Sequence, residues 1–313
     1  MWKFAARRIV LSLPTLFIVS FLAFGMIRIN PDAVVTARLG ESFTEEAAKE
    51  VRAEYGLDNP FYVEYFKWIG NVLTGDLGSS ALSFEPVSAE LGPKIAVTLQ
   101  LALFAILFAI VIGVPIGVYS AMRQDRWPDY FLRSFAIAGL SVPGFYVATL
   151  VLTLFAIQFS WIPPLDKTQF WSDPMENLQQ YALPAFILSL ATSASVMRYA
   201  RTMMLDVLRQ DYIRTAWAKG MRERMVISRH ALRNAMLPVI TILGLAMANL
   251  IGGTVIFESL FTLQGVGSYL VYSVAQRDFA PVQAVTLFFA VAVILINLLV
   301  DVSYTLLDPR AKV

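Results

Sequence analysis

The sequence contains no cysteine and a single histidine, His230. Without cysteine there are no disulfides, thiolate metal sites or cysteine nucleophiles. The histidine lies among arginines, and no second histidine or carboxylate pair stands at metal-ligand spacing. The P-loop motif G-x-x-x-x-G-K-[ST] is also missing, so the chain cannot hold nucleotide phosphates in that manner. We therefore expect no catalytic, metal or cofactor site in this chain, and any ATP it depends on is hydrolysed elsewhere.

Charged residues are also scarce, at 15% of the 313 residues, and the formal net charge is +2. Hydrophobic residues make up 57%, and the mean hydropathy is +0.62. A soluble domain of this length does not need so much apolar material for one core. The composition predicts an integral membrane protein. A net charge this small gives no indication of a nucleic-acid partner.

Apolar runs of about 20 residues, long enough to cross a bilayer as helices, occur six times. Proline and glycine within them do not exclude spanning helices, because neighbouring helices or waters satisfy the freed backbone groups. The sequence therefore predicts an all-α polytopic membrane protein with six transmembrane helices, over Ile9–Ile29, Ile95–Ser120, Ser134–Phe159, Leu183–Met203, Ala235–Phe257 and Pro281–Leu307.

Lysine and arginine are distributed unevenly around these spans. The N-terminus, the 120–133 loop, the 198–233 loop and the C-terminus together carry 17, against 8 in the three segments on the other side. Cytoplasmic loops carry the excess of these residues, so both termini are expected in the cytoplasm.

The first span has a second interpretation as a secretory signal peptide, because Lys3, Arg7 and Arg8 precede the apolar run. Its apolar run of about 20 residues is longer than the apolar region of a signal peptide, which has about 7–15. We therefore expect the segment to be retained as a helix.

Residues 30–94 have the composition of a water-facing segment, with eleven acids and no long apolar run. They predict a small extracytoplasmic subdomain. Ser42-Phe43-Thr44-Glu45 fits a capping box before a helix over Glu46–Tyr55, which Gly56 would end. The aromatic-rich stretch Phe61–Ile69 predicts an interfacial helix with its rings at headgroup level.

The loop at 204–234 is the most polar stretch between two spans. Nine Lys and Arg against three acids lie between Arg198 and Arg233, so the segment must face water. We expect a helix over Leu205–Gly220, capped by Asp206, and a second over Glu223–Arg233 that leads into the fifth span. Such a loop suits docking of a cytoplasmic partner. From the residues alone, a basic segment that touches anionic membrane lipid is an equal alternative.

Polar residues inside the spans are few, and none is an ionisable group at mid-membrane of the kind that ion-driven carriers use. Asn249 and Asn297 are candidates for a translocation path, although interhelical hydrogen bonding is the more common role of such residues. A standalone secondary carrier or channel, and an intramembrane enzyme, remain as alternatives that this scarcity disfavours.

Two stretches of the loop, Asp211–Gly220 and Arg229–Ala235 followed by Leu237-Pro238, resemble the cytoplasmic loop of the oligopeptide, dipeptide and nickel permease family of bacterial ABC importers. The long first outer segment is similar to that of one member of the permease pair. The resemblance extends along the chain through Gly56-Leu57-Asp58, Gly75-Asp76-Leu77-Gly78, Thr98-Leu99, Val142-Pro143, Arg277-Asp278 and Leu307-Asp308-Pro309-Arg310.

The resemblance implies a type I ABC importer permease fold, divided into a first transmembrane helix (1–29), the outer subdomain (30–94) and a five-helix permease core (95–313). Two departures from the family pattern are Trp217, where a cation is common, and Gln264, where proline is expected and the turn would be looser. The loop would contain a coupling helix that docks on a separate ATPase, through Asp211, Tyr212, Arg214, Thr215, Ala216, Lys219 and Gly220.

The implied assembly lies in the bacterial plasma membrane. It comprises this chain, a second permease subunit, two ATPase subunits that bind ATP and Mg, and an extracytoplasmic substrate-binding protein. The implied function is ATP-driven import of peptides by alternating access, with this chain forming half of the passage. Nickel complexes and sugars remain open as substrates.

Overall fold

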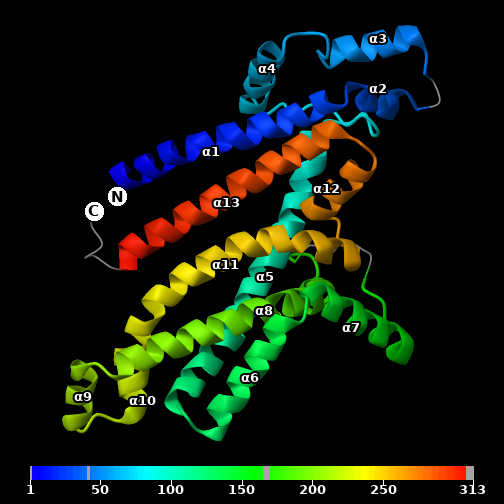
Figure 1. Ribbon diagram of the computed structural model, residues 1–313. Coiled ribbons are helices and arrows are strands. Elements are labelled where there is room, and N and C mark those ends of the chain that lie inside the picture. The colour runs from blue at the N-terminus through cyan, green and yellow to red at the C-terminus, as the bar shows by residue number, and fades with distance from the viewer. Residues whose placement is uncertain (1, 41–42, 165–169, 308–313) are drawn as a thin grey trace. The chain divides into compact units, whose positions relative to one another are not determined.

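The computed structural model describes residues 2–40, 43–164 and 170–307, and within them every regular element is a helix (Figure 1). The helices are α1 (Trp2–Ile29), α2 (Pro31–Leu39), α3 (Glu45–Glu54), α4 (Phe61–Leu73), α5 (Val87–Met122), α6 (Trp127–Ser141), α7 (Gly144–Phe159), α8 (Pro174–Leu208), α9 (Asp211–Ala218), α10 (Glu223–Met225), the π-helix η2 (Val226–Ala231), α11 (Leu232–Leu260), α12 (Val266–Ala275) and α13 (Phe279–Leu307).

The chain packs as two compact units. Among the described residues, the central unit comprises those of 100–262 and 296–307, and the N-terminal unit comprises those of 2–99 and 263–295. Packing therefore groups the segment 30–94 with α1, α12 and most of α13. The division into 1–29, 30–94 and 95–313 follows membrane topology and stays a prediction.

Five helices of the described chain are long and apolar enough to cross a membrane, and the pair α6 and α7 makes a sixth if it counts as one span. The five agree with predicted spans. The expectation of one continuous helix over Ser134–Phe159 is wrong, because α6 and α7 meet at 91°. Pro143 has no N–H to continue the helix and disfavours helical geometry at the residue before it. Val142 is accordingly extended, with φ −102° and ψ 126°.

Two glycines one turn apart bring α5 and α8 close together in the central unit. A Cβ atom on Gly113 would lie 2.7 Å from the carbonyl oxygen of Ser193, and one on Gly117 would lie 2.5 Å from that of Met197. Small residues at this spacing let membrane helices approach backbone to backbone, where dispersion contacts replace the hydrophobic effect as the source of stability.

The helix α3, Glu45–Glu54, agrees with the predicted helix over Glu46–Tyr55 to within one residue at each end. Thr44 is its N-cap, and its Oγ1 accepts a hydrogen bond of 3.2 Å from the backbone N–H of Ala47. Ser42 lies outside the described residues. Gly56 follows the helix end with φ +59°, in the left-handed region that favours glycine, as predicted. Arg28 donates to the carbonyl oxygens of Gly56 and Leu57, at 2.5 and 2.6 Å, and so holds this turn at the end of α1.

The aromatic helix α4 packs on α1. The ring of Phe61 lies 5.0 Å from that of Phe21, and Tyr65 is only 3% exposed, with its hydroxyl 2.8 Å from Ser20 Oγ. The interfacial interpretation is therefore wrong for Tyr65, whose ring is part of a protein core. It stays a prediction for the exposed rings of Tyr62 and Phe66. Amphipathic spacing alone does not distinguish a neighbouring helix from a lipid headgroup layer.

Two side chains hold the loops at Ser80-Ala81 and Gln264–Val266 in the N-terminal unit. Buried Asp278 accepts hydrogen bonds from Ser80 Oγ, at 2.5 Å, and from the backbone N–H of Ala81, at 3.1 Å. Thr98 Oγ1 accepts one of 2.8 Å from the backbone N–H of Val266, just after Gln264. Leu263 is also buried, and the expectation of a looser turn at Gln264 stays a prediction.

Candidate functional site

The helix α9 lies against the central unit by one narrow face. Ile213 and Ala216 are buried, at 0% and 7% exposure, and every other residue of Asp211–Gly220 is exposed. The two buried positions are three apart and therefore point to the same side of a helix. The rest of α9 is left to water or to a partner.

The surface under α9 is a single hydrophobic cluster at the ends of several helices. Its buried residues are Ala121 of α5, Met204 of α8, Ile213 and Ala216 of α9, Val226 and Ala231 of η2, and Ala235 of α11. Close-packed interiors transmit displacement because they leave few voids. A force on α9 would therefore reach α5, α8 and α11 together.

The expected single helix over Leu205–Gly220 is wrong, because α8 continues to Leu208 and α9 begins anew at Asp211. Gln210 between them is extended, with φ −72° and ψ 147°. Asp206 lies in the last turn of α8 and caps nothing. The predicted end is confirmed, since Gly220 has φ +76° after the last turn of α9.

A polar bridge joins α9 to α11. Asn234 Nδ2 donates to the hydroxyl of Tyr212, at 2.8 Å, and also to the carbonyl oxygen of His230, at 3.1 Å. Tyr212 is thus both half exposed and tied to the following helix. Arg214 and Asp211 form a pair of 3.6 Å on the open face, with exposures of 71% and 96%. An ion pair this exposed contributes little to stability.

The second predicted helix, Glu223–Arg233, is present but not regular. Its middle, Val226–Ala231, is the π-helix η2, which runs on into α11 as predicted. Val226 and Ala231 are five residues apart and are both fully buried in the cluster. The i to i+5 bonding of a π-helix is what places residues five apart on one face. Single π turns within helices are frequent at functional sites.

The other predicted site residues lie elsewhere in the central unit. Asn249 is exposed on α11 and lines a hollow of about 440 Å³ between α6, α8 and α11. Asn297 is exposed on α13 and does not line this hollow. The roles of both in translocation, and those of the seven α9 residues toward a partner, stay predictions. Asp308, Pro309 and Arg310 lie outside the described residues.

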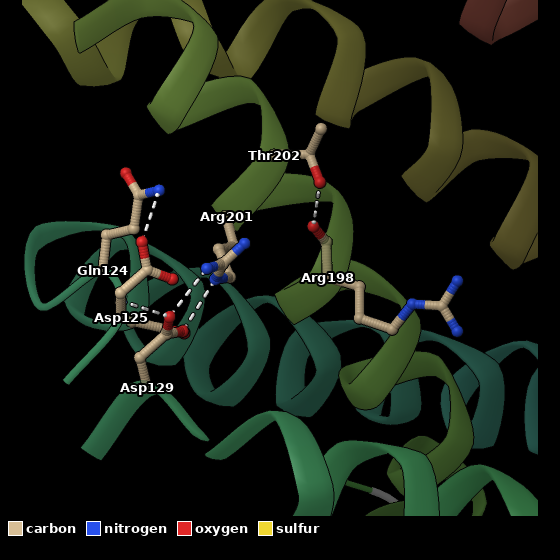
Figure 2. Close-up of polar contacts among 7 residues, drawn as sticks. Gln124, Asp125, Asp129, Arg198, Arg201 and Thr202 are labelled. Atoms are coloured by element: carbon tan, nitrogen blue, oxygen red, sulfur yellow. Dashed lines mark hydrogen bonds and ion pairs between the residues drawn. The ribbon is translucent and has the colours of Figure 1, made fainter. Parts of the chain in front are cut away.

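One polar site was not predicted from the sequence. Asp129, in the first turn of α6, is fully buried and accepts two hydrogen bonds of 2.7 Å from Nε and Nη2 of Arg201 on α8 (Figure 2). Ser120 Oγ and the backbone N–H of Asp125 also donate to it, at 2.5 and 3.1 Å. An acid and a cation at the edges of two apolar runs are a signal for such a pair, but nothing in their spacing identifies the partners.

Glu258, near the end of α11, is also fully buried and was not singled out. In the part of the chain that the structure describes, no three His, Asp or Glu side chains gather as a metal site would require.

Known proteins are similar to this chain along nearly its whole length. The family described as "Binding-protein-dependent transport system inner membrane component" matches residues 113–313, and its N-terminal companion family, "Binding-prot-dependent transport system membrane comp, N-term", matches residues 1–89. A putative peptide transport system permease protein of Brucella abortus (strain 2308) is 38% identical over 306 residues, covering 98% of both chains. The glutathione transport system permease protein GsiC of Escherichia coli (strain K12) is 36% identical, covering all of this chain and 99% of its own.

Among solved structures, two inward-facing conformations of the MetNI methionine ABC transporter share the fold. Their TM-scores are 0.58 and 0.55 at 15% identity. The first covers 70% of this chain and 96% of the solved chain, and the second covers 69% and 95%. The all-helical ABC importer permease fold is therefore confirmed. The chain belongs to the family of binding-protein-dependent transport system inner membrane components, as a permease of the oligopeptide and dipeptide type that its resemblance predicted.

Proposed function

We propose that this permease forms half of the passage of an ATP-driven importer and that α9 is the coupling helix that docks on a separate ATPase subunit. One observation carries the proposal. The short helix α9 packs on α5, α8, η2 and α11 through its buried residues Ile213 and Ala216, while the rest of its surface is exposed. This is the arrangement that a transmitting element requires, with one face fixed to the spans and one free for a partner.

The relatives' names support short peptides or peptide-like molecules as the substrate. The assembly would contain a second permease, two ATPases that bind ATP and Mg, and a substrate-binding protein on the outer side. Both termini and α9 would then lie in the cytoplasm, at the plasma membrane. This chain would catalyse no reaction itself.

The coupling follows from the packing. ATP binding closes the two ATPases, and the closure displaces α9. Because α9 shares a core with α8 and α11 and is bonded to Asn234 through Tyr212, the displacement moves these spans. The ATPase shifts the permease between inward-open and outward-open only to the extent that it binds the two forms with different affinity.

The proposal is tested by reversing the exposed charges of α9. We expect Arg214→Glu combined with Lys219→Glu to lower ATPase recovery at least about tenfold, because reversed charges oppose docking and about 1.4 kcal/mol is one factor of ten. The second permease should be retained. The measurement is purification of the tagged chain from its own membrane in mild detergent, with quantitative mass spectrometry of the proteins that accompany it.

Lys49→Glu is the matched control, since this exposed lysine lies on α3 in the outer segment. It should leave ATPase recovery unchanged. Ala216→Arg would not test docking, because Ala216 is buried and the change would disrupt the cluster under α9 rather than its open face. Recovery of the ATPase at the unaltered level with both charges reversed, or its absence from the unaltered complex, would contradict the proposal.

A further inference from the structure

Two hollows follow one another along α8 in the central unit. The larger is the 440 Å³ hollow with Asn249, and α8 contributes Leu188, Ala191, Thr192, Ser195, Val196 and Tyr199 to its lining. The smaller, of about 220 Å³, is lined by Arg133, Ile137, Arg198, Arg201 and Thr202. Positions 188, 192, 195, 199 and 202 repeat every three to four residues, so they form one face of α8. On α6, Arg133 and Ile137 of the smaller hollow and Leu140 of the larger one are likewise spaced three to four residues apart, so the two hollows follow one another along both helices.

The smaller hollow is positively charged. Arg201 is neutralised by its pair with Asp129, and Figure 2 shows Arg198 extending away from that pair. Arg133 and Arg198 are exposed, and none of the five described residues that line the hollow is acidic. Arg133 and Arg198 therefore share this small space, and the neighbouring acid, Asp129, is already paired with Arg201. An anionic group would relieve their mutual repulsion.

The presence of these arginines also restricts what can cover the surface. A charged side chain within an apolar span is costly unless it faces water or a partner. On α8, Arg198 lies three residues after Ser195 and directly before Tyr199, which both line the larger hollow. The surface thus combines apolar side chains, hydroxyls and an amide with a cationic end, which suits a passage better than a lipid contact.

We infer that this face of α6, α8 and α11 is a wall of the passage, and that Arg133 and Arg198 form an anion-attracting station near its α9 end for the carboxylates of the transported solute. The inference rests on the proposed function and extends it to the chemistry of the passage. A carboxylate is the anionic group that every unblocked peptide carries, and the arginine guanidinium matches its planar geometry.

The absence of cysteine from the sequence makes a direct test available. Thr202→Cys places one thiol beside both arginines. Inside-out membrane vesicles containing the assembled transporter are treated with an anionic or a cationic methanethiosulfonate reagent of similar size, and the residual thiol is measured with a fluorescent maleimide. Each rate is divided by that of the same reagent with free cysteine. We expect Thr202→Cys to react, and to react faster with the anionic reagent.

Adding Arg198→Gln or Arg133→Gln should lower the anionic-to-cationic rate ratio about fivefold at low ionic strength, because removal of a nearby unit charge changes the rates of reagents of opposite sign in opposite directions. Arg209→Gln removes an equal charge from an exposed arginine just after α8 that does not line the hollow. It should leave the ratio unchanged. Ser195→Cys should also react, as a second position on the same wall.

Ser228→Cys, exposed on η2, verifies that the reagents reach the loop side. If it reacts and both Thr202→Cys and Ser195→Cys do not, lipid or a neighbouring subunit covers the face and the inference is wrong. If Thr202→Cys reacts but neither glutamine variant changes the ratio, the anion station is wrong. Failure of the coupling proposal would instead appear as ATPase recovery that does not respond to α9, which the thiol rates do not measure.

Discussion

Replacing Asp129 with alanine is expected to lower the free energy of unfolding by about 3–5 kcal/mol, because removal of one partner leaves a buried charge uncompensated. The charge left behind is Arg201, whose side chain is only 15% exposed. Ser120 Oγ and the backbone N–H of Asp125 lose their acceptor as well. The measurement is the midpoint of thermal unfolding of the purified protein in detergent, followed by the loss of its monodisperse chromatographic peak.

Two variants show whether the loss comes from the orphaned charge. Asp125→Asn removes a neighbouring exposed carboxylate and should leave the midpoint unchanged. Asp129→Leu combined with Arg201→Met replaces the whole pair by apolar groups, and it should recover most of the loss, since such replacements are often neutral. A midpoint for Asp129→Ala equal to that of the unaltered protein would show that the pair is not buried as described.

Replacing Gly117 with valine is expected to cost about 3 kcal/mol, the upper end of the range for overpacking. A Cβ at this position would lie 2.5 Å from the carbonyl oxygen of Met197 and 2.8 Å from the Cβ of Ala200. The first of these atoms belongs to the backbone of α8, so no rotamer change removes the clash. The helices must separate, and their close contact is what holds them together in a membrane. The thermal midpoint is again the measurement.

Gly139→Val provides the matched comparison. Gly139 is also inside an apolar helix, but nothing lies within 4 Å of the position that its Cβ would take. The same change there should leave the midpoint within experimental error or raise it slightly, because valine is the better helix former. Equal losses at the two positions would mean that the cost is a property of the substitution and not of the contact between α5 and α8.

Hydropathy located five spans correctly because the length of an apolar run is a property of the chain alone. The end of α9 at Gly220 could likewise be predicted from local sequence, since the left-handed position after a helix favours glycine. The sequence showed Val142-Pro143 as a motif but did not predict a bend there, because proline is also tolerated in continuous spans.

The remaining misses depend on tertiary structure. No proline or glycine interrupts Leu205–Arg209, and the break at Gln210 places Ile213 and Ala216 on the cluster that other helices build. Asp129 and Arg201 are separated by 72 residues, and no periodicity connects them. Tyr65 had the spacing of an interfacial ring, and only the position of α1 shows that it is buried.

The π-helix η2, between α10 and α11, contains one residue more than a regular α-helical turn would need. If a residue such as Ser228 were deleted, Val226 and Ala231 would stand four apart and would still share a face in a regular α-helix. The same deletion inside α11 would turn every later side chain by about 100°. Length variation is therefore tolerated within η2 and forbidden just beyond it. The helix between α9 and the fifth span can therefore lose one residue at η2 while the side chains of α11 keep their orientation.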